Sequence, residues 1–238
     1  MKTPYLISVL VAALPLNACN TLAVYDHING PSYKTSHQTD AITAFGRTKA
    51  DSQTMPKNEL VMLGDKYIYV ITSSYFDIPG RQSADNSKLQ NILNVKLSQA
   101  FVVYEQGLKP EAGGAFPVRY QRSDNTFSSN FCLNYAENTR LSAAERAREQ
   151  QKLDALQFRK AADGRRFLCM TVNGQVYAKP ENMVYQYRFE TPIPVKLTVQ
   201  EPAHGSKIAT AALLMPLALA ADIVTFPIQA LLIGIYKP

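Results

Sequence analysis

The three histidines and three cysteines of this sequence are the first side chains to consider as metal ligands or nucleophiles. His27, His37 and His204 lie far apart in polar stretches, and none has a second ligand at the spacing that zinc sites use. The Gly-x-Ser-x-Gly, His-Glu-x-x-His and phosphate-loop patterns are absent from the sequence. We therefore expect no metal site, no cofactor and no catalytic residue, in a protein that is not an enzyme.

Cys19 ends an N-terminal stretch that predicts export and lipid attachment. Lys2 is a short positive region, and Tyr5–Leu16 is an apolar stretch too short to span a hydrocarbon core of ~30 Å. The following residues, Leu16-Asn17-Ala18-Cys19, resemble a bacterial lipobox, in which the cysteine carries the lipid after cleavage. The resemblance implies a signal peptide over residues 1–18 and a mature chain acylated at Cys19. An ordinary secretory leader and a retained N-terminal helix are the alternatives.

Lipid at Cys19 implies a location in the bacterial cell envelope. Three acyl chains would hold the chain on a leaflet permanently, because two lipid signals already anchor a protein stably. In lipoproteins an Asp after the lipidated cysteine favours inner-membrane retention, whereas Asn20 stands here. We therefore expect the outer membrane, with the domain facing the periplasm, and the inner membrane is the alternative.

Export also gives the other two cysteines, Cys132 and Cys169, an oxidising environment. Their even number favours a disulfide, and the loop that it closes would contribute ~3–4 kcal/mol in the chain-entropy account. Two buried free thiols are the alternative. Because the sequence has no Cys-x-x-Cys, it does not indicate thiol exchange chemistry.

The composition fits one folded domain with apolar ends. The chain has 238 residues, a hydrophobic fraction of 46% and a formal charge of +6 at pH 7. The hydrophobic fraction is too high for a disordered chain. The cationic residues are spread along the sequence instead of forming the dense patch that nucleic-acid binding needs, so we expect no nucleic-acid partner.

Residues 59–200 are expected to form a periplasmic α+β domain, mostly an antiparallel sheet with one or two helices. Residues 19–58 are polar, which predicts a lipidated tether. Apolar runs flank Gly64-Asp65 and Asn173-Gly174, which predicts two hairpins. The stretch 66–72 is apolar on both faces, which indicates a central strand. Further strands are expected at 101–104, 115–122, 126–135 and 195–199.

Two helices are expected in this domain. Helical spacing of apolar residues follows Ser87, which is a suitable N-cap. Ser142 and Glu145 form a capping box that opens the second helix, expected over 143–158. The charged residues of this helix, Glu149 among them, are expected on a solvated face.

Residues 207–238 form an apolar segment in which Asp222 is the single charge between Lys207 and Lys237. Pro216 and Pro227 should split or kink a helix there, and Asp222, Thr225 and Gln229 form a narrow polar stripe at helical spacing. We expect a broken helix or a hairpin that lies in the lipidated leaflet. A kinked transmembrane helix, or a hydrophobic helix packed on the domain, is the alternative.

This segment also carries a family resemblance. Met215-Pro216, five residues, Asp222, four residues and Pro227-Ile228-Gln229 is similar to the Leu/Met-Pro-x5-Asp-x4-Pro-x-Asp pattern of small bacterial lipoproteins of the YceK/YidQ type. Residues 19–33 are similar to the short polar stretch that follows their lipidated cysteine. The chain departs from the pattern at Ile223 and Gln229, where Thr and Asp are expected. The resemblance implies an enlarged lipoprotein with an inserted periplasmic domain, and it implies a location rather than an activity.

Anchors at both ends of the domain would hold it in a defined pose on one membrane. That arrangement suits a non-enzymatic interaction or assembly module, such as an accessory subunit of an envelope complex. The expected partners are membrane lipid, through Cys19 and the C-terminal segment, and an envelope component that the sequence does not identify. The alternatives are an envelope hydrolase acting on peptidoglycan or lipid, and a surface-exposed lipoprotein for host interaction or exclusion.

Overall fold

The computed structural model describes residues 33–77, 86–109, 114–181, 183, 186–202 and 223–225. These residues form strands and two helices in the chain order β1 (Tyr33–Thr48), β2 (Leu60–Gly64), β3 (Tyr67–Phe76), α2 (Asn86–Asn94), β4 (Val102–Glu105), β5 (Phe116–Gln121), β6 (Thr126–Tyr135), α3 (Ala143–Ala155), β7 (Arg159–Lys160), β8 (Arg166–Ala178), β9 (Ile193–Pro202) and β10 (Ile223–Thr225).

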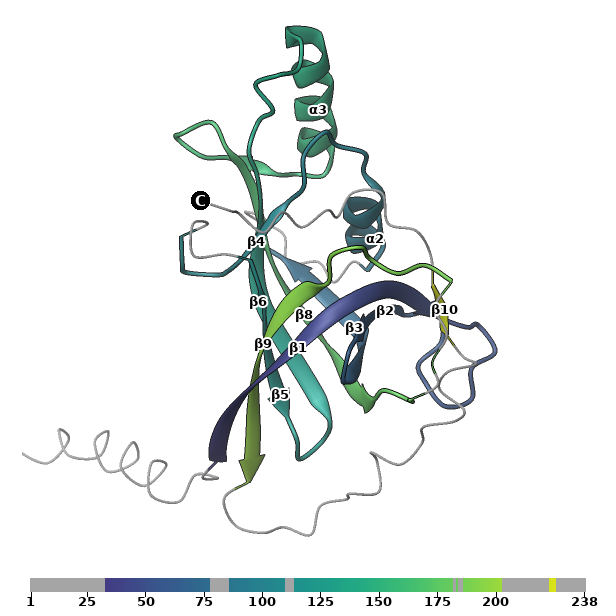
Figure 1. Cartoon of the computed structure of the whole chain (residues 1–238). Helices are drawn as coiled ribbons and strands as arrows, with labels where there is room; N and C mark the ends of the chain where they lie inside the picture. Colours follow the sequence, from purple (N-terminus) through teal and green to yellow (C-terminus); the bar gives the residue numbers. More distant parts are fainter. Residues whose placement is uncertain are drawn as a thin grey trace, which may run out of the picture.

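The strands form one sheet that curls until it closes into a barrel (Figure 1). The closed ring runs β6-β5-β9-β1-β2-β3-β8 and returns to β6, because β6 pairs with both β5 and β8. Strand β9 lies between β1 and β5 in the sheet. It is antiparallel to β1 and parallel to β5, and the other pairings of the described strands are antiparallel. The predicted mostly antiparallel sheet with two helices is confirmed.

The interior of the barrel is filled with side chains. Every second residue of a strand points inward, and among the largest of the fully buried side chains are Tyr69, Tyr120 and Met170. Helix α2 lies across one open end and buries Leu89, Ile92 and Leu93 (Figure 1). The cavity left beneath this helix measures about 20 Å³, which is room for about one water molecule.

A second apolar cluster covers part of the outer surface of the barrel. Val61, Leu63, Ile68 and Val70 are fully buried although they point outward from β2 and β3. Further members and contacts of this cluster are Ala44, Met55, Tyr177, Met183 and Ile223. Strand β3 is therefore covered on both faces, as the apolar pattern of 66–72 predicts.

Helix α3 begins at the predicted capping box, in which the Ser142 hydroxyl accepts from the Glu145 N–H and the Glu145 carboxylate accepts from the Ser142 N–H. The helix ends at Ala155 instead of the predicted residue 158, because Gln157 adopts a positive φ of 63°. Phe158 then turns into the core and stacks on Phe101, with ring centroids 5.1 Å apart.

The predicted tether is wrong for residues 33–58. Residues 33–48 form β1, which pairs with β9, β2 and β10. The first half of β1, as far as Thr39, lies beyond the apolar core and carries polar side chains on both sides. The sequence there lacks the apolar alternation that predicts a strand. Met55, in the loop that follows, is buried in the outer cluster. The domain therefore includes Tyr33 and does not begin at Glu59.

The predicted hairpin at Asn173-Gly174 is also wrong, whereas the hairpin at Gly64-Asp65 is confirmed by the β2–β3 pairing. Strand β8 runs straight through Asn173 and Gly174. A Cβ at Gly174 would collide with the Val70 carbonyl oxygen of β3. The glycine thus permits a close approach of two strands next to a register shift in β3.

The C-terminal apolar segment is described at three residues only. Ile223–Thr225 form β10, an antiparallel partner of β1, and not the helix expected there. The Thr225 hydroxyl accepts hydrogen bonds from the backbone N–H groups of Gln186 and Tyr187, at 3.1 and 3.2 Å. The rest of 207–238 lies outside the described residues.

Candidate functional site

The predicted cysteine pair is joined in a disulfide in the structure. Cys132 of β6 and Cys169 of β8 are direct partners in the ladder between these strands, with Cα atoms 3.9 Å apart. Tyr104 and Phe167 pack against the disulfide on the outer surface of the barrel. Four motif residues of the C-terminal segment and the lipidation residue lie outside the described residues: Cys19, Pro216, Asp222, Pro227 and Gln229.

The most extensive polar surface lies on five neighbouring strands, and we call it the polar face. In its central row His37 of β1 pairs with Thr198 of β9, Thr198 with Arg119 of β5, Arg119 with Ser128 of β6, and Ser128 with Asn173 of β8. A row on each side continues the pattern. The polar face consists of Thr35, His37, Thr39, Pro117, Arg119, Gln121, Thr126, Ser128, Asn130, Thr171, Asn173, Gln175, Lys196, Thr198 and Gln200.

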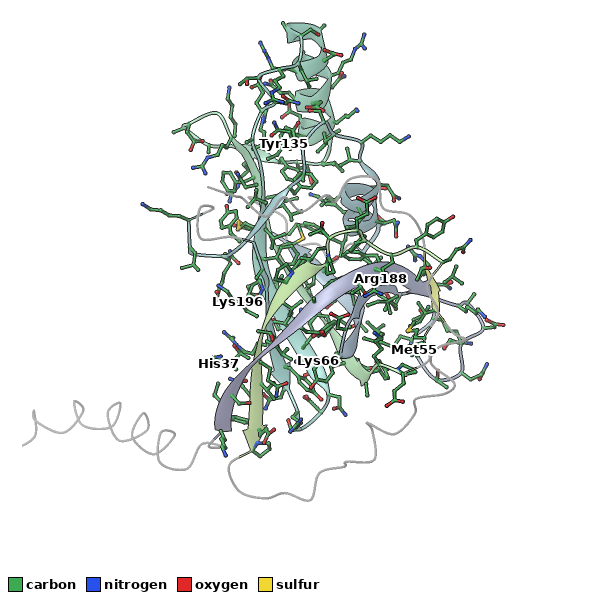
Figure 2. The ribbon with its side chains drawn as sticks, in the orientation of Figure 1. His37, Met55, Lys66, Tyr135, Arg188 and Lys196 are labelled. Carbon is green, nitrogen blue, oxygen red and sulfur yellow. A yellow bond between two sulfur atoms is a disulfide. The ribbon has the colours of Figure 1, made fainter. Side chains whose placement is uncertain are left out.

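Strand alternation explains why these residues share one surface. Most of the residues between them on β5, β6, β8 and β9 point into the barrel and are buried, among them Val118, Tyr120 and Leu197. Each residue of the polar face is at least partly exposed. The polar face and the apolar outer cluster therefore lie on different parts of the barrel: Figure 2 shows His37 and Lys196 on one side and Met55 on the other.

Two hollows shape the polar face. A groove of about 780 Å³ is lined by His37, Lys196 and Asn130 together with Glu105 of β4. A second hollow of about 350 Å³ lies on the other side of the central row. It is lined largely by Asn173 and by the side chains of Gln121, Thr126, Gln175 and Gln200. Arg119 and Ser128 line both hollows, so Arg119 stands where they meet.

The charges of the groove are unbalanced. Arg119 and Lys196 are exposed, and within the described part of the chain neither has an ion-pair or hydrogen-bond partner. Several other arginines do have a carboxylate partner, as in the ion pairs Arg146–Glu137 and Arg166–Asp154. Glu105 is the acidic residue that lines the groove. The groove therefore presents two cations without an ion-pair partner among the described residues, together with one carboxylate and several neutral hydroxyl and amide groups.

The neutral side chains of the polar face add hydrogen-bonding capacity. Ser, Thr, Asn and Gln side chains can each donate and accept. Thr198 Oγ1 lies 3.4 Å from Nδ1 of His37, a hydrogen bond along the central row. This surface can bind a polar, anionic ligand through charge and hydrogen bonds.

Asp40 is a buried carboxylate at the inner side of β1, and its hydrogen bonds are structural. It accepts from the Tyr69 hydroxyl at 2.9 Å and from the N–H groups of Ala41 and Lys66 at 2.8 and 3.0 Å. Burial, and then the neighbouring Asp40 charge, raise the pKa of Tyr69. Gly64 leaves room for this carboxylate, because a Cβ there would collide with it.

Glu149 is the second buried carboxylate, contrary to the solvated position expected for it on α3. It accepts hydrogen bonds from the Tyr135 hydroxyl and from both the N–H and the hydroxyl of Ser98. Burial, and then the hydrogen bond to Glu149, raise the pKa of Tyr135 to about 12. This network attaches α3 to the end of the barrel and does not line the groove.

No set of three or more His, Cys, Asp or Glu side chains in the described ranges is close enough to share a metal ion. Of the helices in those ranges, none is both long enough and apolar enough to cross a membrane.

Sequence reasoning missed the polar face. Its residues come from five strands, and one of these is β1, which was taken for a tether. The available signal was alternation in Lys196-x-Thr198-x-Gln200, which places polar side chains at every second position, whereas residues 35–39 are polar at every position. The hydrogen-bonded order of the strands, which brings these two stretches together, cannot be read from one sequence.

Comparison with known proteins gives one match. A family model described as the YidX N-terminal domain matches residues 30–200. No curated protein and no solved structure matches the chain. The matched range includes β1 to β8 and β9 as far as Gln200, and thus the closed barrel and all residues of the polar face.

Proposed function

The chain belongs to the family of the YidX N-terminal domain, and we propose that it is a lipid-anchored bacterial envelope protein whose barrel acts as a non-enzymatic interaction module. The polar face is the binding surface in this proposal. Lipid at Cys19 is the proposed anchor, and the periplasmic side of the outer membrane is the proposed location.

The observation that carries the proposal is the contrast between the inside and the outside of the barrel. Side chains fill the interior to a residual cavity of about 20 Å³, whereas the outer grooves measure about 780 and 350 Å³. Arg119 and Lys196, which have no ion-pair partner among the described residues, lie on this outer surface. A ligand would therefore bind on the polar face, as in an adaptor, and not inside the barrel.

The ends of the described chain support anchoring at one end of the barrel. Tyr33 and Pro202 are partners in the β1–β9 ladder, so the chain enters β1 and leaves β9 at the same place. The stretch toward Cys19 precedes Tyr33, and the stretch toward 207–238 follows Pro202. We propose that this end of the barrel faces the membrane. Membrane contact by the stretch within 207–222 belongs to the same proposal, whereas Ile223–Thr225 pair with Gly46–Thr48 at the far end of β1.

Site-specific crosslinking in cells tests the interaction module. A photoreactive phenylalanine analogue is placed at Gln121, on the polar face, and, as the matched control, at Arg148, an exposed residue of α3. Adducts that form from position 121 and are weak or absent from position 148 are expected. Equal adducts from both positions, or none from position 121, would contradict the proposal.

A further inference from the structure

We propose that the polar face binds an acidic, carboxylate-bearing polysaccharide, and that Arg119 pairs with its carboxylate groups. The inference rests on the proposed function, since it names the ligand class of the same surface.

The surroundings of Arg119 favour a carboxylate. A guanidinium is a planar fork that matches the two oxygens of a carboxylate. Thr198 and Ser128 flank Arg119 on the neighbouring strands, and each brings a hydroxyl donor beside it. No described carboxylate occupies the guanidinium, so a carboxylate from outside the chain can take this place.

The rows around Arg119 favour a ligand that is rich in hydroxyl groups. Neighbouring strands lie ~4.8 Å apart, so the central row and the row of Gln121 present a hydrogen-bonding side chain at about that interval, whereas Pro117 interrupts the row of Lys196. Most of these side chains both donate and accept, as sugar hydroxyls do. A glycan chain lying along a row would meet a new partner on each strand. Lys196, one row from Arg119, would be near a second acidic group.

The same surface is less suited to a peptide or to a membrane. Peptides bind to open sheet edges or in apolar grooves, whereas these five strands are paired and the polar face has a single apolar residue, Pro117. Attraction to anionic lipid takes clusters of about four to eight cationic side chains, and the polar face has Arg119 and Lys196. A polar acidic polymer is the class that fits both the charges and the amides.

Binding of this kind should be sensitive to salt. Arg119 and Lys196 are exposed, and ionic strength screens the interactions of exposed charges. The polar face has no Phe, Tyr or Trp ring for stacking on a sugar, so charge and hydrogen bonds supply the affinity.

The test uses the full-length protein in detergent and titration calorimetry. The probes are oligogalacturonate as the acidic glycan, neutral dextran, poly-glutamate, and glycerol phosphate as the soluble headgroup of an anionic lipid. We expect binding of oligogalacturonate that weakens with salt, and weaker or no binding of the other probes. The R119Q variant should lose roughly tenfold to a hundredfold in affinity, the effect of one hydrogen bond to a charged group.

The R148Q variant is the matched control, because Arg148 is an exposed arginine on α3 and should not affect binding. Absence of oligogalacturonate binding, equal affinity for poly-glutamate or for glycerol phosphate, or unchanged affinity in R119Q would each overturn the inference. If crosslinks still form from position 121 in that case, the interaction module stands with a ligand of another class.

Discussion

Gly46 is the backbone partner of Thr225, and this pair joins β1 to a strand from the C-terminal apolar segment. Strand β9 pairs with β1 from Tyr33 to Ile42, and β10 pairs with it from Gly46 to Thr48. The β1–β9 ladder stops at Ile193, the first residue of β9, and β10 pairs with β1 beyond that point (Figure 1). Part of the apolar segment is therefore a component of the domain.

If β10 belongs to the domain, the change Thr225→Val should destabilise it. Valine keeps the shape but cannot accept the hydrogen bonds from the N–H groups of Gln186 and Tyr187, and the loss of a hydrogen bond costs ~0.5–1.5 kcal/mol. Urea unfolding measures this loss. The matched variant Val224→Thr alters the neighbouring side chain, which is 50% exposed, and should leave stability unchanged. Equal stability of the two variants would show that β10 does not contribute.

Loss of the disulfide should destabilise the barrel without changing its fold. The double change Cys132→Ala and Cys169→Ala releases a constraint worth ~3–4 kcal/mol in the chain-entropy account. Urea unfolding of the oxidised protein and of the double variant gives the difference. The wild-type protein in reductant should approach the double variant, and a wild-type stability that reductant leaves unchanged would argue against the bridge.

Removal of the Glu149 carboxylate should loosen α3. In the Glu149→Ala variant the Tyr135 hydroxyl and two donors of Ser98 lose their acceptor, and the buried Tyr135 hydroxyl alone costs ~1–3 kcal/mol when it is left without one. Hydrogen exchange should become faster in α3 before it does so in β6. Glu190→Ala removes an exposed carboxylate and serves as control. Identical exchange of α3 in both variants would refute the structural role of Glu149.

Alkaline pH should destabilise the domain partly through Tyr135. Its pKa is about 12 in the folded chain, whereas the ordinary pKa of tyrosine is 10.0, so between these values the unfolded chain loses the proton while the folded chain keeps it. Stability is therefore complete below pH 10.0 and falls as pH rises. The urea midpoint of Tyr135→Phe should fall less between pH 8 and pH 11 than that of the wild type. Tyr75→Phe, at a ring 43% exposed, should behave as the wild type; equal slopes for all three would contradict the prediction.

The sequence predicts correctly those elements whose signal comes from residues close together in the chain. The capping box at Ser142 and the apolar runs around Gly64-Asp65 depend on neighbouring residues, and both appear as expected. The prediction of a hairpin at Asn173-Gly174 is wrong because this dipeptide is found both in tight turns and, as here, where two strands approach closely. The contact with Val70 of β3 that decides between them is long-range, and so it is invisible in a local pattern.

The polar face and the buried Glu149 were not predictable for a related reason. Thr198 becomes the neighbour of both His37 and Arg119 because β9, near the end of the chain, inserts between β1 and β5. Glu149 has the helical spacing of a solvated charge, and it is buried because Tyr135 and Ser98 meet it from outside the helix. In both cases tertiary contacts override the local pattern.

The central claim is a lipid-anchored envelope protein, and mass spectrometry of the N-terminal peptide from purified membranes tests it most directly. The account predicts a mature chain that begins at Cys19, with a diacylglyceryl group on its sulfur and an acyl group on its amine. An unmodified Cys19 thiol, or a chain that still carries residues 1–18, would contradict the account.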